Sequence, residues 1–316
     1  MTEIQRPDRH FHLKVPDARQ TSEWWRLLRP HTLTASIMPV LIGTAISFEK
    51  GKIDCLLFIT MLFASILIQS AVNMFNEYFD FKRGLDTKNS VGIGGVIVRN
   101  EIPGRIVLKT AFSFFIFSVL LGAYICTRTS WLVAVAGSLS MLIGYLYSGS
   151  ERPISYTPFG ELTAGIFMGP MIVLIAFYIQ TGQISTDSIL LSIPISILVA
   201  AILLANNIRD AERDSRKGRR TIAVLLGQPR STSLLAGMFC LTFAFTAFLI
   251  IFKYVSPFAL ISFACIPTAI RSLKTFRIKR TPSEMMPAMK DASVLHSEFG
   301  LLFTVGIILG KFFLPG

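Results

Sequence analysis

The segment Asn73-Met-Phe-Asn-Glu-Tyr-Phe-Asp-Phe-Lys-Arg-Gly-Leu-Asp86, the first acidic motif, places three carboxylates at the end of a long apolar stretch. A second segment, Asn206-Asn-Ile-Arg-Asp-Ala-Glu-Arg-Asp-Ser-Arg-Lys-Gly218, the second acidic motif, repeats its main residue types at a constant offset of 134 positions. Five positions match: Asn73 with Asn207, Asn76 with Asp210, Asp80 with Asp214, Arg83 with Lys217 and Gly84 with Gly218. The chain therefore carries two copies of one motif.

The spacing within each motif predicts a polar face on a helix, because positions i, i+3 and i+7 lie on one side of an α-helix. These faces hold Asn73, Asn76 and Asp80 in the first motif, and Asn207, Asp210 and Asp214 in the second. Carboxylates near the C-terminal end of a helix are disfavoured by the helix dipole, so we expect a cation between the two faces. Hard oxygen ligands of this kind suit Mg²⁺, which often shares its coordination shell with substrate phosphates.

Composition identifies an integral membrane protein. Of the 316 residues, 52% are hydrophobic and only 16% are charged, whereas a soluble domain has about 25% charged residues. Stretches of about 17 to 22 apolar residues can cross a bilayer core of about 30 Å. Nine such spans are predicted, at residues 32–48, 54–75, 106–126, 131–148, 160–179, 187–206, 231–252, 255–272 and 298–315.

The distribution of Lys and Arg predicts the orientation of these spans. If the N-terminus lies inside, 26 of the 31 basic residues fall in the inner segments and 5 in the outer ones. Because basic residues accumulate in cytoplasmic loops, we expect the N-terminus and both acidic motifs on the cytoplasmic side of the cell membrane, and the C-terminus outside. Residues 1–22 form a polar cytoplasmic segment without the apolar region of a signal peptide, and residues 23–316 form one transmembrane domain.

The net charge of +12 does not indicate a nucleic-acid partner. The excess of basic residues lies in loops beside the predicted spans, where it sets topology and contacts anionic lipid. The four cysteines show no metal-ligand or redox spacing. Lipid bilayer is therefore the partner that composition indicates.

The connecting segments carry weaker signals. Residues 145–161 form a loop with aromatic residues, and residues 271–297 are interpreted as a solvated basic connector. The glycines after the first motif, Gly92, Gly94 and Gly95, form a loop that can bring backbone N–H groups close to phosphate. Two pairs of glycines four residues apart, Gly165 with Gly169 and Gly306 with Gly310, predict close helix packing.

A weaker repeat extends the duplication upstream of the motifs. Leu33-Thr34-Ala35 in the first span resembles Leu162-Thr163-Ala164 in the fifth. We therefore expect an all-α bundle in which spans one to four and five to eight form two related halves, completed by a ninth span. In duplicated membrane folds the binding site lies between the repeats.

The two motifs together resemble those of the UbiA superfamily of intramembrane prenyltransferases. The relevant residues are Asn76-Glu-Tyr-Phe-Asp80 with Asp86, and Asp210-Ala-Glu-Arg-Asp214-Ser-Arg-Lys-Gly218. Arg29-Pro-His-Thr-Leu-Thr-Ala35 and Gly218-Arg-Arg-Thr-Ile-Ala-Val-Leu-Leu-Gly227 are similar to the branch that prenylates 1,4-dihydroxy-2-naphthoate in menaquinone synthesis. One departure is Glu77, where Asp is commoner in the superfamily.

The resemblance implies Mg²⁺-dependent transfer of a polyprenyl group from a polyprenyl diphosphate to an aromatic acceptor, 1,4-dihydroxy-2-naphthoate, with loss of diphosphate and CO₂. It implies a metal site at Asp80, Asp86, Asp210 and Asp214, supported by Asn76 and Glu77. The candidates for binding diphosphate are Asn73, Lys82, Arg83, Asn207, Lys217 and Arg220. The candidates for the acceptor side are Tyr145, Tyr147, Tyr156 and Glu161.

Two alternatives remain open at this point. The acceptor can be another aromatic compound, such as 4-hydroxybenzoate or homogentisate. A duplicated bundle with intramembrane acids is also typical of ion-coupled secondary transporters. Transporter carboxylates, however, tend to lie near the membrane midplane, whereas these lie at helix ends and are followed by basic residues.

Overall fold

The computed structural model describes residues 18–51, 53–86, 95–99 and 101–313. Within these ranges the secondary structure is entirely helical, which confirms the predicted fold class. Most of the predicted N-terminal segment, residues 1–17, lies outside the described residues, as do Gly92 and Gly94 of the predicted glycine loop. The described chain begins with a short helix, α1 (Ala18–Leu28).

Nine helical segments of the described chain are long and apolar enough to cross a membrane. Six are continuous helices: α2 (Pro30–Lys50), α3 (Cys55–Lys82), α4 (Gly104–Arg128), α5 (Leu132–Gly149), α8 (Thr186–Arg216) and α11 (Pro282–Phe313). A seventh, α9 (Ile222–Ile251), is interrupted by a non-helical residue at Gly227. The fifth span is broken into α6 (Gly160–Met168) and α7 (Pro170–Thr181), and the eighth consists of a 3₁₀ helix, η2 (Pro257–Cys265), followed by α10 (Ile266–Ile278). The prediction of nine spans is therefore confirmed.

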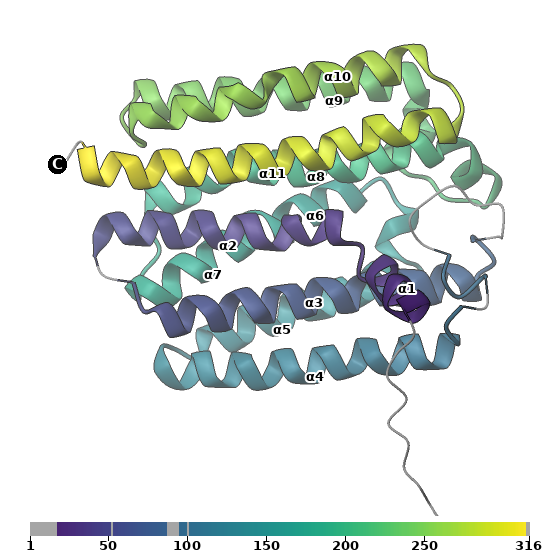
Figure 1. The fold of residues 1–316 in the computed structure, drawn as a ribbon, viewed down its shortest axis with the longest axis horizontal. Helices are drawn as coiled ribbons and strands as arrows, with labels where there is room; N and C mark the ends of the chain where they lie inside the picture. Colours follow the sequence, from purple (N-terminus) through teal and green to yellow (C-terminus); the bar gives the residue numbers. More distant parts are fainter. Residues whose placement is uncertain (1–17, 52, 87–94, 100, 314–316) are drawn as a thin grey trace, which may run out of the picture.

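The spans run side by side, with α9 and α10 along one edge of the bundle and α4 along the other (Figure 1). Helix α8 lies between these edges and contacts α2, α6, α7, α9 and α11. It is also the most buried of the described spans. The second acidic motif therefore continues directly from the central helix of the bundle.

Glycines allow the close helix contacts that the sequence predicts. A Cβ atom at Gly169 would lie 2.6 Å from Cα of Ser196 in α8, and one at Gly306 would lie 2.6 Å from Cα of Ala259 in η2. Atoms this close would overlap, so only glycine permits these approaches. The interpretation of both glycine pairs as packing features is confirmed.

The prediction of a long basic connector at residues 271–297 was wrong. Helix α10 continues to Ile278 and α11 begins at Pro282, which leaves a connection of three residues. Apolar residues at helical spacing explain the extension, because Met285, Met289 and Ala292 are buried. The seventh span also begins earlier than predicted, at Ile222, and contains a kink at Gly227, where φ is 73°.

Candidate active site

Both acidic motifs end their helices in the same hydrogen-bonded turn. The glycines Gly84 (φ 67°) and Gly218 (φ 78°) adopt the left-handed conformation, which glycine reaches without steric cost. The residue after each glycine donates its N–H to the carbonyl five positions back, Leu85 to Asp80 at 2.9 Å and Arg219 to Asp214 at 2.9 Å. This is the Schellman motif, and in both copies it turns the chain back over the acidic helix end.

Arg219 bridges the two motifs. Its Nη2 lies 2.9 Å from Oδ1 of Asp80, and its Nη1 lies 3.4 Å from Oδ1 of Asp214. The guanidinium also lies over the ring of Tyr156, 5.0 Å from its centroid. One largely buried cation therefore contacts a carboxylate from each motif.

Arg213 joins the remaining carboxylates to this cluster. Its guanidinium nitrogens lie 3.1 Å from Asp210, 3.7 Å from Asp86 and 3.8 Å from Asp214. Asp210 also accepts two hydrogen bonds from Arg209, at 2.6 and 2.9 Å. The expectation that the two motifs face each other is confirmed, since all four predicted metal-binding carboxylates belong to one network.

Burial and mutual repulsion shape the electrostatics at the edge of this network. Burial raises the pKa of Asp86 to about 6, and the nearby carboxylate of Asp80 adds to the rise. Burial alone would lower the pKa of Arg219, but the carboxylates of Asp80 and Asp214 outweigh it and raise that pKa above its ordinary value. Arg219 is therefore a permanent cation, whereas Asp86 takes up a proton more readily than an exposed aspartate.

The network encloses a polar cavity of about 150 Å³. Its walls come from the start of α2, the ends of α3, α5 and α8, and the segments that follow these three helices, together with Met289 of α11. Three of the predicted carboxylates, Asp80, Asp86 and Asp210, line it. Four arginines line it as well: Arg29, Arg209, Arg213 and Arg219. A site with this mixture suits an anion that shares the carboxylates with a cation.

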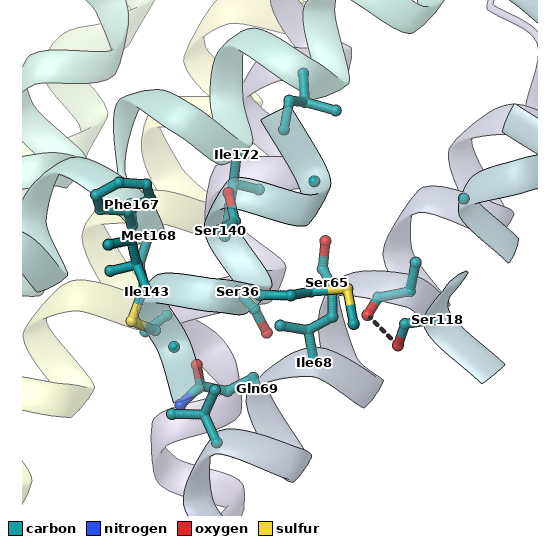
Figure 2. Close-up of a pocket in the computed structure, with 18 of the residues that line it drawn as sticks. Ser36, Ser65, Ile68, Gln69, Ser118, Ser140, Ile143, Phe167, Met168 and Ile172 are labelled. Carbon is teal, nitrogen blue, oxygen red and sulfur yellow. Dashed lines mark hydrogen bonds between the residues drawn. The ribbon is translucent and has the colours of Figure 1, made fainter. Parts of the chain in front are cut away.

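An apolar cavity of about 370 Å³ adjoins the polar one. The two share lining residues from four helices and the α1–α2 junction, among them Arg29, Asn76, Tyr147 and Asn206. From there the apolar cavity extends between α3, α4 and α5 to Cys126 and Trp131, at the far end of α4 and α5. Figure 2 shows Ser36, Ser65 and Gln69 around it, together with apolar residues such as Ile68, Phe167 and Ile172.

Glu77 has contacts that differ from those of the other motif carboxylates. It is 1% exposed, and its Oε2 lies 3.1 Å from Nη2 of Arg29. Its Oε1 accepts a hydrogen bond from the backbone N–H of Gly95 at 2.7 Å. Glu77 does not line the polar cavity. Its side chain instead connects the α1–α2 junction, the end of α3 and the segment beginning at Gly95.

Three other predicted residues lie at or beside the cavities. Asn76 lines both and accepts a hydrogen bond from the hydroxyl of Ser148. Tyr147 also lines both. Asn73 lines the apolar cavity and donates to the carbonyl of Leu28 at 2.8 Å. These side chains lie where the polar cavity meets the apolar one.

A second group of predicted residues forms hydrogen bonds that connect the segments around the polar cavity. Asn207 lines the polar cavity and donates to Oε1 of Glu161 at 2.9 Å, while Glu161 itself lies behind the wall. Arg83 donates to the carbonyls of Ser148 and Ser150 at 2.6 and 2.7 Å, which joins the end of α3 to the end of α5.

The remaining predicted residues lie outside the lining of both cavities. Lys82, Lys217 and Arg220 are exposed. Tyr145 packs against Phe75, with ring centroids 5.3 Å apart. Tyr156 contacts Arg219 but does not itself line a cavity. The structure therefore separates these five from the position that the sequence suggested.

Sequence reasoning missed the four arginines that line the polar cavity. Arg209 and Arg213 are four residues apart on α8, each next to a motif aspartate in sequence, so the alternation of acid and base was a usable signal. Arg219 follows the glycine that ends the motif, and the Schellman turn returns it to the carboxylates. Arg29 lies directly before Pro30, the first residue of α2, and has a left-handed backbone, with φ of 52°.

The donor set is compatible with a divalent cation. Among the described residues, no group of three or more His, Cys, Asp or Glu side chains is close enough to hold a metal ion by itself. The carboxylates are instead joined through arginines, and Oδ2 of Asp214 is buried without a hydrogen-bond partner in the described chain. Because Mg²⁺ keeps several waters and uses only one or two carboxylates directly, these side chains fit such an ion.

Comparison with known proteins assigns the fold and these motifs to a family. The sequence profile described as the UbiA prenyltransferase family matches residues 36–293, which includes both acidic motifs. The chain belongs to the UbiA prenyltransferase family. The resemblance inferred from the motifs is therefore confirmed, and the transporter alternative has no support.

Two relatives are similar to this UbiA-family chain over most of their length. It is 47% identical to the 1,4-dihydroxy-2-naphthoate octaprenyltransferase of Bacillus subtilis, over 91% of this chain and 93% of the relative. It is 31% identical to the UbiA prenyltransferase domain-containing protein 1 homolog of Drosophila melanogaster, over 88% of this chain and 77% of the relative.

Solved structures of UbiA homologs share the fold. An apo structure from Aeropyrum pernix K1 matches with a TM-score of 0.68 and 16% identity, covering 87% of this chain and 97% of that one. A structure from Archaeoglobus fulgidus, described as bound to DMAPP and Mg²⁺, matches with a TM-score of 0.60 and 19% identity, covering 90% and 99%. The nine-span architecture is thus that of the UbiA fold.

Proposed function

We propose that this protein transfers the polyprenyl group of a polyprenyl diphosphate to 1,4-dihydroxy-2-naphthoate, releasing diphosphate and CO₂ and forming a demethylmenaquinol. The observation that carries the proposal is the junction of the two cavities: a charged chamber of about 150 Å³ opens onto an apolar one of about 370 Å³. A polyprenyl diphosphate has the same division between a charged head and an apolar tail. The 47% identity to the Bacillus subtilis enzyme supports the choice of acceptor.

In this proposal the diphosphate occupies the polar cavity. Arg213 and Arg219 are within reach of both motifs, and they bind the diphosphate oxygens. Arg29 lies where the cavities meet, and its Nε is buried without a partner in the described chain. In the proposed complex, Arg29 therefore lies beside the C–O bond that joins the diphosphate to the prenyl chain. Fixed cations at this position stabilise the negative charge that develops on the leaving diphosphate.

Mg²⁺ would be held by one or two carboxylates of the set Asp80, Asp86, Asp210 and Asp214 and by water, and it would neutralise the diphosphate and make it a better leaving group. The DMAPP and Mg²⁺ of the Archaeoglobus fulgidus homolog support this choice of ion. The arginines already hold these carboxylates in one network.

The chemical step breaks the allylic C–O bond, and both electrons leave with diphosphate. An electron pair of the naphthoate ring forms the new C–C bond at the carboxyl-bearing carbon. The bond to the carboxylate then breaks, CO₂ leaves, and its electron pair restores the aromatic ring. The apolar walls beside Tyr147 keep water from the allylic cation.

We further propose that the charged end of the bundle faces the cytoplasm and that the described C-terminal end of α11 faces outward. The excess of Lys and Arg in the segments at the motif end supports this orientation. It gives a charged diphosphate and an anionic acceptor access from the aqueous side on which the polar cavity lies.

The test is product formation by the purified protein in detergent, supplied with a polyprenyl diphosphate, 1,4-dihydroxy-2-naphthoate and Mg²⁺, and followed by mass spectrometry. We expect a prenylated, decarboxylated naphthoquinol that disappears with EDTA and returns with added Mg²⁺. The same assay with 4-hydroxybenzoate and homogentisate measures acceptor choice. A product with one of these but not with the naphthoate would overturn the acceptor, whereas no diphosphate release with any acceptor would overturn the reaction.

A further inference from the structure

Two glycines lie in the wall of the apolar cavity with open space in front of them. Gly122 belongs to α4 and Gly137 to α5, and both line the cavity. A Cβ atom built at either position would meet no heavy atom within 4 Å. This distinguishes them from Gly144, also in the cavity wall, where a Cβ would lie 2.8 Å from Val72 of α3.

The open space at Gly137 is inside the protein. Val133 and Gly144 lie four residues before and seven residues after Gly137, so the three share one face of α5. Val133 is buried in a cluster that includes Leu57 and Met61 of α3, and Gly144 approaches Val72 of α3. This face therefore points toward α3, and the space before Gly137 is the cavity.

The same argument applies to Gly122. Ser118 and Cys126 lie one turn before and one turn after it on α4, and both are buried. The hydroxyl of Ser118 donates to the carbonyl of Ala64 in α3 at 3.4 Å (Figure 2). Gly122 lies between two residues that face the interior, yet a Cβ atom at Gly122 would meet no heavy atom within 4 Å.

The two glycines lie at a similar depth, because α4 and α5 are antiparallel neighbours joined by residues 129–131. Gly137 is ten residues from Tyr147, which lines both cavities. Ten helical residues correspond to about 15 Å. An isoprene unit adds four carbons to a chain and, with C–C bonds of about 1.5 Å, about 5 Å of extended length. The glycines therefore lie about three isoprene units from the junction.

We propose that Gly122 and Gly137 determine which prenyl chain lengths this protein accepts, by leaving the apolar cavity open at the depth of the third to fourth isoprene unit. The proposal rests on the proposed function, since it assigns the cavity to the prenyl tail. Beyond the glycines the cavity continues to Met61, Cys126 and Trp131, so a longer tail passes between them. A larger side chain at either glycine closes this passage.

The experiment measures kcat/KM for the wild type, Gly122→Leu, Gly137→Leu and Gly137→Ala, with allylic diphosphates of two to eight isoprene units. Gly237→Leu is the matched control, because Gly237 lies on α9 outside both cavities and also has open space at its Cβ position. Melting temperatures of all variants report their folding. We expect both cavity leucine variants to accept two units like the wild type, and to lose about tenfold or more with five or more units. The kcat/KM of Gly137→Ala with the longer substrates should lie between those of the wild type and Gly137→Leu.

The outcomes separate the inference from the function on which it rests. A wild type that prenylates the acceptor, with leucine variants whose chain-length profile is unchanged, would overturn the inference and leave the function standing. An equal loss at every chain length, in variants that melt like the wild type, would also overturn it. A wild type that releases diphosphate from no allylic substrate would overturn both.

Discussion

Arg219 lies with its Nη2 2.9 Å from Oδ1 of Asp80, although 139 positions separate the two residues in the chain. The same guanidinium contacts Asp214, five residues before it, at 3.4 Å. Two helix ends from distant parts of the sequence therefore share one cation. In the proposed function, the diphosphate binds at this shared cation, between the two motifs.

Removing one carboxylate from each motif tests whether both take part. We expect Asp80→Asn and Asp214→Asn to lower kcat by about 10²-fold or more each, because both lie in the charge network around the proposed diphosphate. Product formation and diphosphate release provide the measurement. Asp187→Asn, which removes an exposed carboxylate paired with Lys50, is the matched control. Normal turnover in both motif variants would contradict the site.

Arg219 and Arg220 are neighbours in sequence, but the structure gives them different positions. Arg219 is largely buried between two aspartates, whereas Arg220 is exposed. We expect Arg219→Gln to reduce kcat/KM for the diphosphate by about 10²-fold, and Arg220→Gln to change it by about twofold or less. Steady-state kinetics with varied diphosphate separate the two. The reverse ranking would favour the sequence-based choice of Arg220.

We expect Glu77 to stabilise the fold and not to bind the metal ion. Its carboxylate pairs with Arg29 and accepts from Gly95, so Glu77→Gln leaves a partly buried guanidinium without its counter-charge. We predict a loss of about 1–3 kcal/mol in the free energy of unfolding, measured as a lower melting temperature. Glu151→Gln makes the same chemical change at an exposed position. If Glu77→Gln melts like the wild type but loses Mg²⁺-dependent turnover, Glu77 is a metal-site residue after all.

Close packing at Gly306 predicts a stability effect without any role in chemistry. A Cβ there would overlap the backbone of Ala259, so Gly306→Ala should cost about 1–3 kcal/mol. Gly237→Ala has open space and removes a flexible helical glycine, which should stabilise the helix by about 0.5–1 kcal/mol. Thermal unfolding in detergent measures both. Equal melting temperatures would mean that the α11–η2 contact relaxes at little cost.

Local sequence signals predicted the number of spans well but not every boundary. Apolar runs are long because the bilayer requires it, so each of the nine spans was visible. The segment at residues 271–297 was misread because its basic residues lie on the outer faces of helices. Its buried residues, such as Met285 and Met289, follow a helical period that a hydropathy average hides.

The sequence also predicted some residues of the candidate site and not others. The sequence placed the aspartates of both motifs because a repeat at a fixed offset and at helical spacing is readable along one chain. The sequence did not show which basic residues line the polar cavity. In the structure Arg213 and Arg219 line it, whereas Lys217 and Arg220 are exposed. That choice depends on the direction in which each side chain leaves the end of α8. A turn at Gly218 changes this direction between adjacent residues.

By itself, the amino-acid sequence determined the membrane class, the nine helical spans and the paired acidic motifs, because hydropathy and helical periodicity are local properties of the chain. Only the tertiary structure decided which cations join the carboxylates, that Glu77 pairs with Arg29, and that an apolar cavity with two open glycines adjoins the charged one. These features depend on how α2, α3, α4, α5 and α8 pack against one another. The periodicity of one helix shows which of its faces is buried, but not which distant helix packs against that face.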